Sequence, residues 1–122
     1  MSQQEQNYRI DYIELPATDI SGTKSFYSSV FGWQFEDYGP SYTSFQDGRL
    51  AGGFNTEAQP SGASPAQTRG VLVVIYAADL EDTSAKVKRA GGRIIREIFE
   101  FPGGRRFHFA DPNGNELAVW SE

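Results

Sequence analysis

The chain has 122 residues, of which 39% are hydrophobic and 14% aromatic, so it is long and apolar enough to fold as one domain around a core. Its 16 acidic and 11 basic residues give a net charge of −5, which argues against nucleic-acid binding, because such binding requires clustered positive charge. The absence of cysteine excludes disulfides, cysteine-ligated zinc and thiol nucleophiles. The sequence shows neither a signal peptide nor a long apolar run, so we expect a cytoplasmic protein without a membrane span.

A weak internal repeat divides the sequence into two halves. The segment Ala-Thr-Asp-Ile at residues 17–20 is matched by Ala-Ala-Asp-Leu at residues 77–80, at an offset of sixty. Each copy has a β-rich apolar run before its Asp and a helix-like stretch after it. This shared order of elements predicts two related modules.

In the first half, residues 10–15 are predicted to form a strand, and a helix is predicted to begin after Asp19. The Asp19 carboxylate is expected to cap the helix by accepting from the free N–H groups of its first turn. Apolar side chains at i,i+4 spacing give this helix one buried stripe, and Gly32 is expected to end it in the left-handed conformation. Three strands should follow, over residues 33–38, 42–46 and 50–55, with a tight turn at Asp47-Gly48.

The second half repeats this order after a linker at residues 56–69 that is rich in Pro, Ser and Gly. The run 71–76 is predicted to be a strand buried on both faces, because it is almost continuously apolar. Asp79 should cap the second helix, and Gly91-Gly92 should end it. The remaining strands are expected over residues 93–98, 106–109 and 116–120, with a tight turn at 111–114.

The predicted fold is therefore α+β, with two βαβββ modules that form curved mixed sheets around a cleft. We expect a single domain over residues 1–122, with modules at about 8–55 and 70–121. Gly52-Gly53 removes two side chains from the last strand of the first module. This pair indicates either a close approach by a ligand or a bulge that curves the sheet.

Two motifs give the chain a resemblance to a known family. The first motif is Glu-Leu-Pro-Ala-Thr-Asp at residues 14–19, followed by Phe-Tyr at 26–27 and Val-Phe-Gly-Trp at 30–33. The second is Phe-His-Phe-Ala-Asp-Pro-Asn-Gly-Asn at residues 107–115. Over residues 8–121 the chain resembles the vicinal oxygen chelate superfamily, which includes glyoxalases, bleomycin-resistance proteins and ring-cleavage dioxygenases such as dihydroxybiphenyl dioxygenase.

The resemblance implies four positions at which enzymes of this superfamily hold a divalent metal. They correspond here to Tyr12, Leu72, Ala118 and a residue near Gly53 or Phe54. None of these is a usual imidazole or carboxylate ligand, so no metal cofactor is expected. An alternative set, Glu14, His108 and Glu116, remains open as an unconventional metal site.

We therefore expect a binding protein for a small molecule, of the glyoxalase and bleomycin-resistance type, that works as a homodimer. Its ligand-binding cleft is predicted to be lined by Tyr12, Glu14, Leu72, Val74, Tyr76, Glu116, Ala118 and Trp120. Arg49, Arg105 and Arg106 are candidates for pairing with an anionic ligand at its mouth. The alternative is an enzyme resembling lactoylglutathione lyase or a dioxygenase, with an unconventional metal site. No catalytic residue is assigned.

Overall fold

The computed structural model describes residues 7–8, 10–57 and 71–122, and contains two four-stranded mixed sheets and two helices. The first module consists of β1 (Tyr12–Pro16), α1 (Ile20–Phe31), β2 (Gln34–Asp37), β3 (Tyr42–Gln46) and β4 (Ala51–Asn55). The second consists of β5 (Val73–Tyr76), α2 (Leu80–Arg89), β6 (Arg93–Phe101), β7 (Gly104–Ala110) and β8 (Glu116–Ser121). The predicted α+β fold with two βαβββ modules is confirmed. Most of the predicted linker lies outside the described residues.

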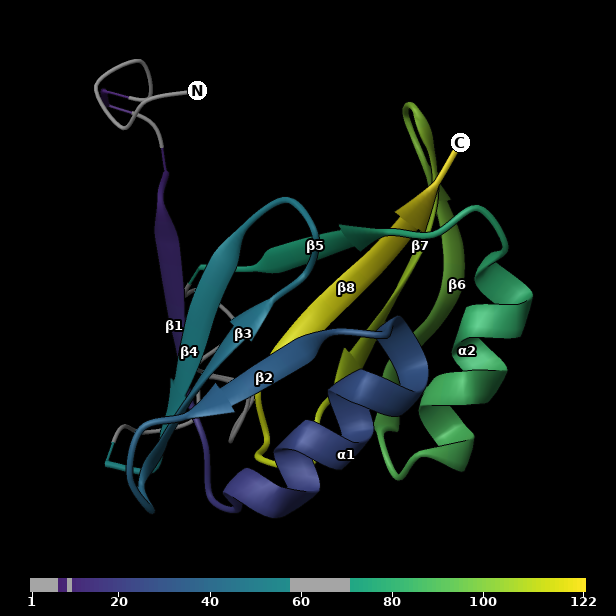
Figure 1. Ribbon diagram of the computed structural model, residues 1–122. Helices are drawn as coiled ribbons and strands as arrows, with labels where there is room; N and C mark the ends of the chain where they lie inside the picture. The colour runs from purple at the N-terminus through teal and green to yellow at the C-terminus, as the bar shows by residue number, and fades with distance from the viewer. Residues whose placement is uncertain (1–6, 9, 58–70) are drawn as a thin grey trace.

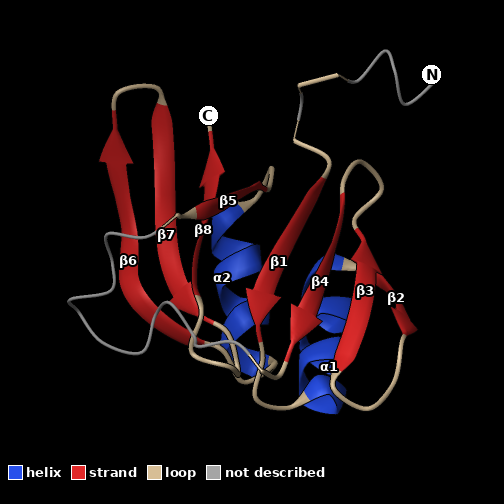
Figure 2. Cartoon of the chain, turned by 90° about the vertical axis from the view of Figure 1, so that its left-hand side faces the viewer, coloured by secondary structure: helices blue, strands red, loops and turns tan. Residues whose placement is uncertain are grey.

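The two sheets have the same topology. The strand order is β1-β4-β3-β2 in the first sheet and β5-β8-β7-β6 in the second, and in each sheet the first and last strands of the module pair in parallel. The sheets stand side by side, with both helices behind them (Figure 2). Each sheet therefore has one face packed on the helices and one face without a helix, which we call its open face.

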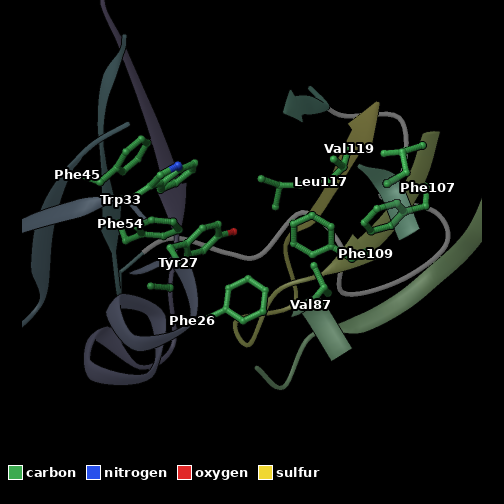
Figure 3. Close-up of a cluster of buried hydrophobic side chains, with 12 residues drawn as sticks. Phe26, Tyr27, Trp33, Phe45, Phe54, Val87, Phe107, Phe109, Leu117 and Val119 are labelled. Atoms are coloured by element: carbon green, nitrogen blue, oxygen red, sulfur yellow. The ribbon is translucent and has the colours of Figure 1, made fainter. Parts of the chain in front are cut away.

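The core lies on the helix side of both sheets and is strongly aromatic. Tyr27 of α1 stacks on Trp33 at 4.6 Å between ring centroids, and Trp33 stacks on Phe45 at 4.5 Å. Phe26 joins this cluster to the second module through Phe109, at 6.0 Å. Figure 3 shows the side chains of α1 between those of the two sheets, so that a single core unites the modules.

The predicted turn at residues 111–114 also joins the modules. The buried Asp111 carboxylate accepts from the backbone N–H groups of Asn113 and Asn115, and from the Tyr27 hydroxyl at 2.9 Å. Burial raises the pKa of Asp111, although these hydrogen bonds oppose the shift. The Asn115 amide donates to the Pro16 carbonyl at 2.6 Å. The turn thus fixes α1 and β1 of the first module.

The two helices are capped differently, and the prediction for the first was wrong. Asp79 accepts from the Asp82 N–H at 3.0 Å, as predicted, whereas the Asp19 side chain makes no capping hydrogen bond. Asn113 of the second module instead holds the residues just before the helix, because its Oδ1 accepts from the Thr18 N–H at 2.7 Å and from the Asp19 N–H at 3.3 Å. Gly32 ends α1 with φ of 73°, as predicted.

Two further predictions require correction. The strand β5 is not buried on both faces: Val74 and Tyr76 are 44% and 51% exposed, because they point to the open face. The strand β4 contains no bulge at Gly52-Gly53, since it pairs in continuous register with both neighbours. Instead, a Cβ at Gly52 would overlap the Ile13 carbonyl and the Phe45 ring.

Candidate functional site

Each sheet has its open face on the side away from α1 and α2 (Figure 1). On β1, Ile13 and Leu15 are half-buried, with Leu15 packed against the core, so the alternation of the strand directs Tyr12 and Glu14 to the open face. On β8, Leu117 and Val119 are buried in the core. The same alternation therefore directs the next set of predicted cleft residues to the second open face: Glu116, Ala118 and Trp120.

The first open face contains a hydrogen-bonded pair of tyrosines. The hydroxyls of Tyr12 and Tyr42 lie 2.5 Å apart, although the two residues come from β1 and β3. They cross β4 above Gly53, where a Cβ would overlap the Tyr42 hydroxyl. Glycine at this position is therefore required by the tyrosine pair.

The Tyr42 hydroxyl is held in its protonated form. Its pKa is raised, first by burial and then by hydrogen bonding to Tyr12 and by the neighbouring Glu14 carboxylate. A phenol that stays protonated near neutral pH can donate a hydrogen bond to a ligand oxygen. Tyr42 was not among the predicted cleft residues. Its proximity to Tyr12 follows from the order of the strands in the sheet, which the spacing of residues in the sequence does not indicate.

The second open face contains a paired histidine and glutamate. His108 Nδ1 lies 2.8 Å from Glu116 Oε2, and their side chains are only 12% and 14% exposed. His108 Nε2 is buried and has no hydrogen-bond partner among the described residues. The neighbouring carboxylate therefore satisfies one ring nitrogen of His108 only.

The residues at the family's metal positions do not suit a divalent cation. Ala118 has no donor atom in its side chain, and neither does Leu72, which precedes β5. Tyr12 is a phenol already engaged with Tyr42. In the described part of the chain, no group of three or more His, Asp or Glu side chains is placed to hold a metal ion. Of the alternative metal ligands Glu14, His108 and Glu116, only His108 and Glu116 lie close together, and Glu14 is not grouped with them.

Arg105 and Arg106 lie on opposite sides of the second sheet, whereas the third candidate, Arg49, lies between β3 and β4 of the first module. Arg105 points toward the helices and pairs with Glu81 at 2.7 Å, so it does not lie at the predicted cleft. Arg106, the next residue, points to the open face.

A surface cavity of about 460 Å³ lies away from both open faces, at the N-terminus of α1, where the Lys24 ammonium is paired with Asp37 at 2.9 Å.

The fold and the sequence together define the family. The model of the Glyoxalase/Bleomycin resistance protein/Dioxygenase superfamily matches residues 9–119, and the chain belongs to this family.

Individual relatives agree with this assignment. The chain is 29% identical to a glyoxylase-like domain-containing protein of Didymella fabae, over 91% of each chain. It is 27% identical to a protein of Mycobacterium tuberculosis and Mycobacterium bovis that is named "Putative glyoxylase CFP32". The match covers 90% of this chain but only 44% of CFP32, so the chain spans less than half the length of that relative.

Solved structures show the same fold. A glyoxalase-related enzyme from Fulvimarina pelagi superimposes with a TM-score of 0.76 at 20% identity, over 94% of this chain and 88% of the other.

Among the described helices, neither is long and apolar enough to span a membrane.

Proposed function

We propose that this protein binds a small molecule on the open faces of its sheets, and that it does so without a divalent metal. The observation that carries the proposal is the replacement of the family's metal donors. Tyr12, at one donor position, is hydrogen-bonded to Tyr42, and the pair covers Gly53, near another donor position. A hydrogen-bonded aromatic surface thus stands where the resemblance would place a cation.

The proposed binding surface keeps the residues named from the sequence: Tyr12, Glu14, Leu72, Val74, Tyr76, Glu116, Ala118 and Trp120. Tyr76 and Trp120 contact each other edge to face at 5.3 Å between ring centroids. Exposed aromatic rings offer stacking area, and the neighbouring polar groups give direction to a ligand.

A thermal-shift screen of small organic molecules, run with and without Zn²⁺, Ni²⁺, Mn²⁺ or Fe²⁺, tests this proposal. A ligand that binds the folded state raises the Tm by mass action. We expect stabilising ligands whose effect does not depend on added metal. Elemental analysis of untagged protein should find no stoichiometric metal, and one bound equivalent needed for binding would contradict the proposal.

We further propose a cytoplasmic homodimer. Outside the proposed binding surface, the described residues also expose large apolar side chains, including Ile10 at 76%, Tyr38 at 60% and Ile95 at 38%, and a second copy that covers them would leave the binding surface free for a ligand. Sedimentation at micromolar concentration should show a dimer, and a monomer would contradict this part of the proposal.

An enzyme resembling lactoylglutathione lyase or a dioxygenase is the alternative function, favoured by the His108–Glu116 pair. A carboxylate that holds one nitrogen of an imidazole orients the ring for proton transfer at the other nitrogen. Turnover of a glutathione hemithioacetal or a catechol that is lost in His108→Gln would support the enzyme and contradict a purely binding role.

A further inference from the structure

We infer that the open face of the second sheet is a binding site for an organic anion, with a carboxylate or phosphonate group attached to a flat apolar body. The inference rests on the proposed binding function and specifies the class of ligand. It follows from the way that β6 and β7 place two arginines around one phenylalanine.

Irregular pairing of β6 brings these side chains together. The register between β6 and β7 shifts twice, between Ile94 and Arg96 and again between Arg96 and Phe99. Regular alternation would place residues 96 and 99 on opposite faces of the sheet. The second shift instead places Arg96 opposite His108 and Phe99 opposite Arg106, so that all four reach the open face. Irregularities of this kind re-aim side chains and occur often beside functional sites.

The two guanidinium groups are arranged around the Phe99 ring. The Arg96 Cζ atom lies 3.5 Å from the ring centroid, and the Arg106 Cζ atom lies 5.4 Å from the centroids of both Phe99 and Phe101. A ring can cover the flat side of a guanidinium, but the N–H groups along its edge still require oxygen acceptors. A carboxylate or phosphonate presents oxygens with the geometry that this edge prefers.

Among the described residues, no carboxylate pairs with these two arginines. Within the described ranges, neither Arg96 nor Arg106 forms an ion pair, whereas Arg105, on the other side of the same strand, is paired with Glu81 at 2.7 Å. Two acids lie at this face, and both have partners: Glu116 is engaged by His108 at 2.8 Å, and Glu122 accepts from the Tyr76 hydroxyl at 2.6 Å. In a chain with a net charge of −5, two neighbouring arginines without an acidic partner form a local positive site.

One donor atom of Arg106 is buried and unpaired. Its Nε is shielded from solvent and has no hydrogen-bond partner in the described part of the chain. A buried polar atom without a partner is rare in folded proteins, because it forfeits the hydrogen bonds that water would supply. An anion lying against Arg106 after a small movement of the surrounding side chains would supply the missing acceptor.

Aromatic rings extend from the arginines and indicate the rest of the ligand. Trp120 pairs with Arg106 across the β7–β8 ladder, and its ring contacts Phe101 at 6.5 Å and Tyr76 at 5.3 Å between centroids. Tyr76 is 51% exposed, so the aromatic surface is accessible. This combination favours an anion attached to a planar apolar group over a free inorganic ion.

The test is calorimetric titration of the full chain with four probes that separate charge from shape. They are 2-naphthoate, the neutral 2-naphthalenemethanol, the cationic naphthylmethyl-trimethylammonium, and acetate, which has the carboxylate without the ring. We expect 2-naphthoate to bind at least about tenfold more tightly than each of the other three. Equal binding of the neutral probe, or preference for the cationic probe, would overturn the anion site and leave the binding function standing. Absence of binding by all four would count against both.

Variants locate the site. Arg106→Gln and Arg96→Gln should each weaken 2-naphthoate binding by about tenfold, and Arg106→Lys, which keeps the charge but loses the planar fork, should weaken it less. Arg105→Gln is the matched control, since it removes an equal charge from the same strand on the opposite side, and it should leave the affinity within about twofold. Circular dichroism confirms that each variant is folded. Equal losses in Arg105→Gln and Arg106→Gln would mean that net charge, and not this site, attracts the anion.

Discussion

Asn113 is predicted to contribute more to the free energy of unfolding than Asp19, the residue at the N-cap position of α1. Its Oδ1 accepts from the Thr18 N–H at 2.7 Å and from the Asp19 N–H at 3.3 Å, and its amide donates to Thr23 Oγ1 at 2.8 Å. Asn113 and Thr23 are buried, at 4% and 0% exposure. Asn113→Ala therefore removes an acceptor at the start of the helix and leaves polar groups without partners.

The magnitude follows from two contributions. Loss of a hydrogen bond costs about 0.5–1.5 kcal/mol, and a buried donor left without an acceptor costs about 1–3 kcal/mol. We therefore expect Asn113→Ala to lower the free energy of unfolding by about 2–4 kcal/mol. Asp79→Ala should cost about 0.5–2 kcal/mol, because Asp79 does cap its helix. Asp19→Ala should cost less than about 0.5 kcal/mol, because its side chain makes no capping hydrogen bond.

Urea denaturation, followed by circular dichroism at fixed protein concentration, measures all three values. The m-value should stay unchanged, so that the midpoints report stability alone. The reasoning is refuted if Asn113→Ala is as stable as the wild type, or if Asp19→Ala is as costly as Asp79→Ala.

Three further predictions concern the turn and the tyrosine pair. Tyr27→Phe should destabilise by about 1.5–3 kcal/mol in urea, because the hydroxyl donates to the buried Asp111 carboxylate. Burial raises the pKa of Asp111 in the folded state. The free energy of unfolding of the wild type, relative to that of Asp111→Asn, should therefore fall as the pH rises through that raised pKa. Urea denaturation of both proteins at several pH values measures this difference, and a difference that does not change with pH would show that the pKa is unshifted. Gly53→Ala should displace Tyr42 and cost about 1–3 kcal/mol, and the same substitution in a Tyr42→Phe background should cost less if the hydroxyl is the group that is displaced.

The sequence was sufficient for the order of the elements, because each one carries its own local signal. Gly32 and the turn at 111–114 mark ends that depend on backbone conformation, and both are found where expected. The double irregularity of β6 leaves no such signal. Its sequence, Arg-Ile-Ile-Arg-Glu-Ile-Phe-Glu-Phe, contains no glycine or proline to mark a register shift, so Arg96 and Phe99 could not be assigned to one face.

Long-range contacts explain the errors. The start of α1 is held by Asn113, which is 95 positions from Thr18, whereas local spacing indicated a cap by Asp19. The apolar run in β5 predicted burial on both faces because every side chain in it is hydrophobic. The sequence could not indicate that no helix covers one of these faces. Tyr42 was missed because β3 reaches Tyr12 only across the intervening strand β4.

The family signature and the proposed ligand site have separate roles in this molecule. The Asp111 carboxylate accepts from Tyr27, Asn113 and Asn115, and these contacts fix one module on the other. Among the described residues, three buried side-chain atoms have no hydrogen-bond partner: Asn115 Oδ1 in this turn, and Arg106 Nε and His108 Nε2 on the open face of the second sheet. Polar groups that stabilise a fold are expected to have most of their partners within the protein, whereas those that recognise a ligand keep some hydrogen-bonding capacity free. By this criterion, the Asp111 turn of the family motif maintains the architecture, and the proposed ligand recognition falls to the open-face residues of β6 and β7, which include His108 of the same motif.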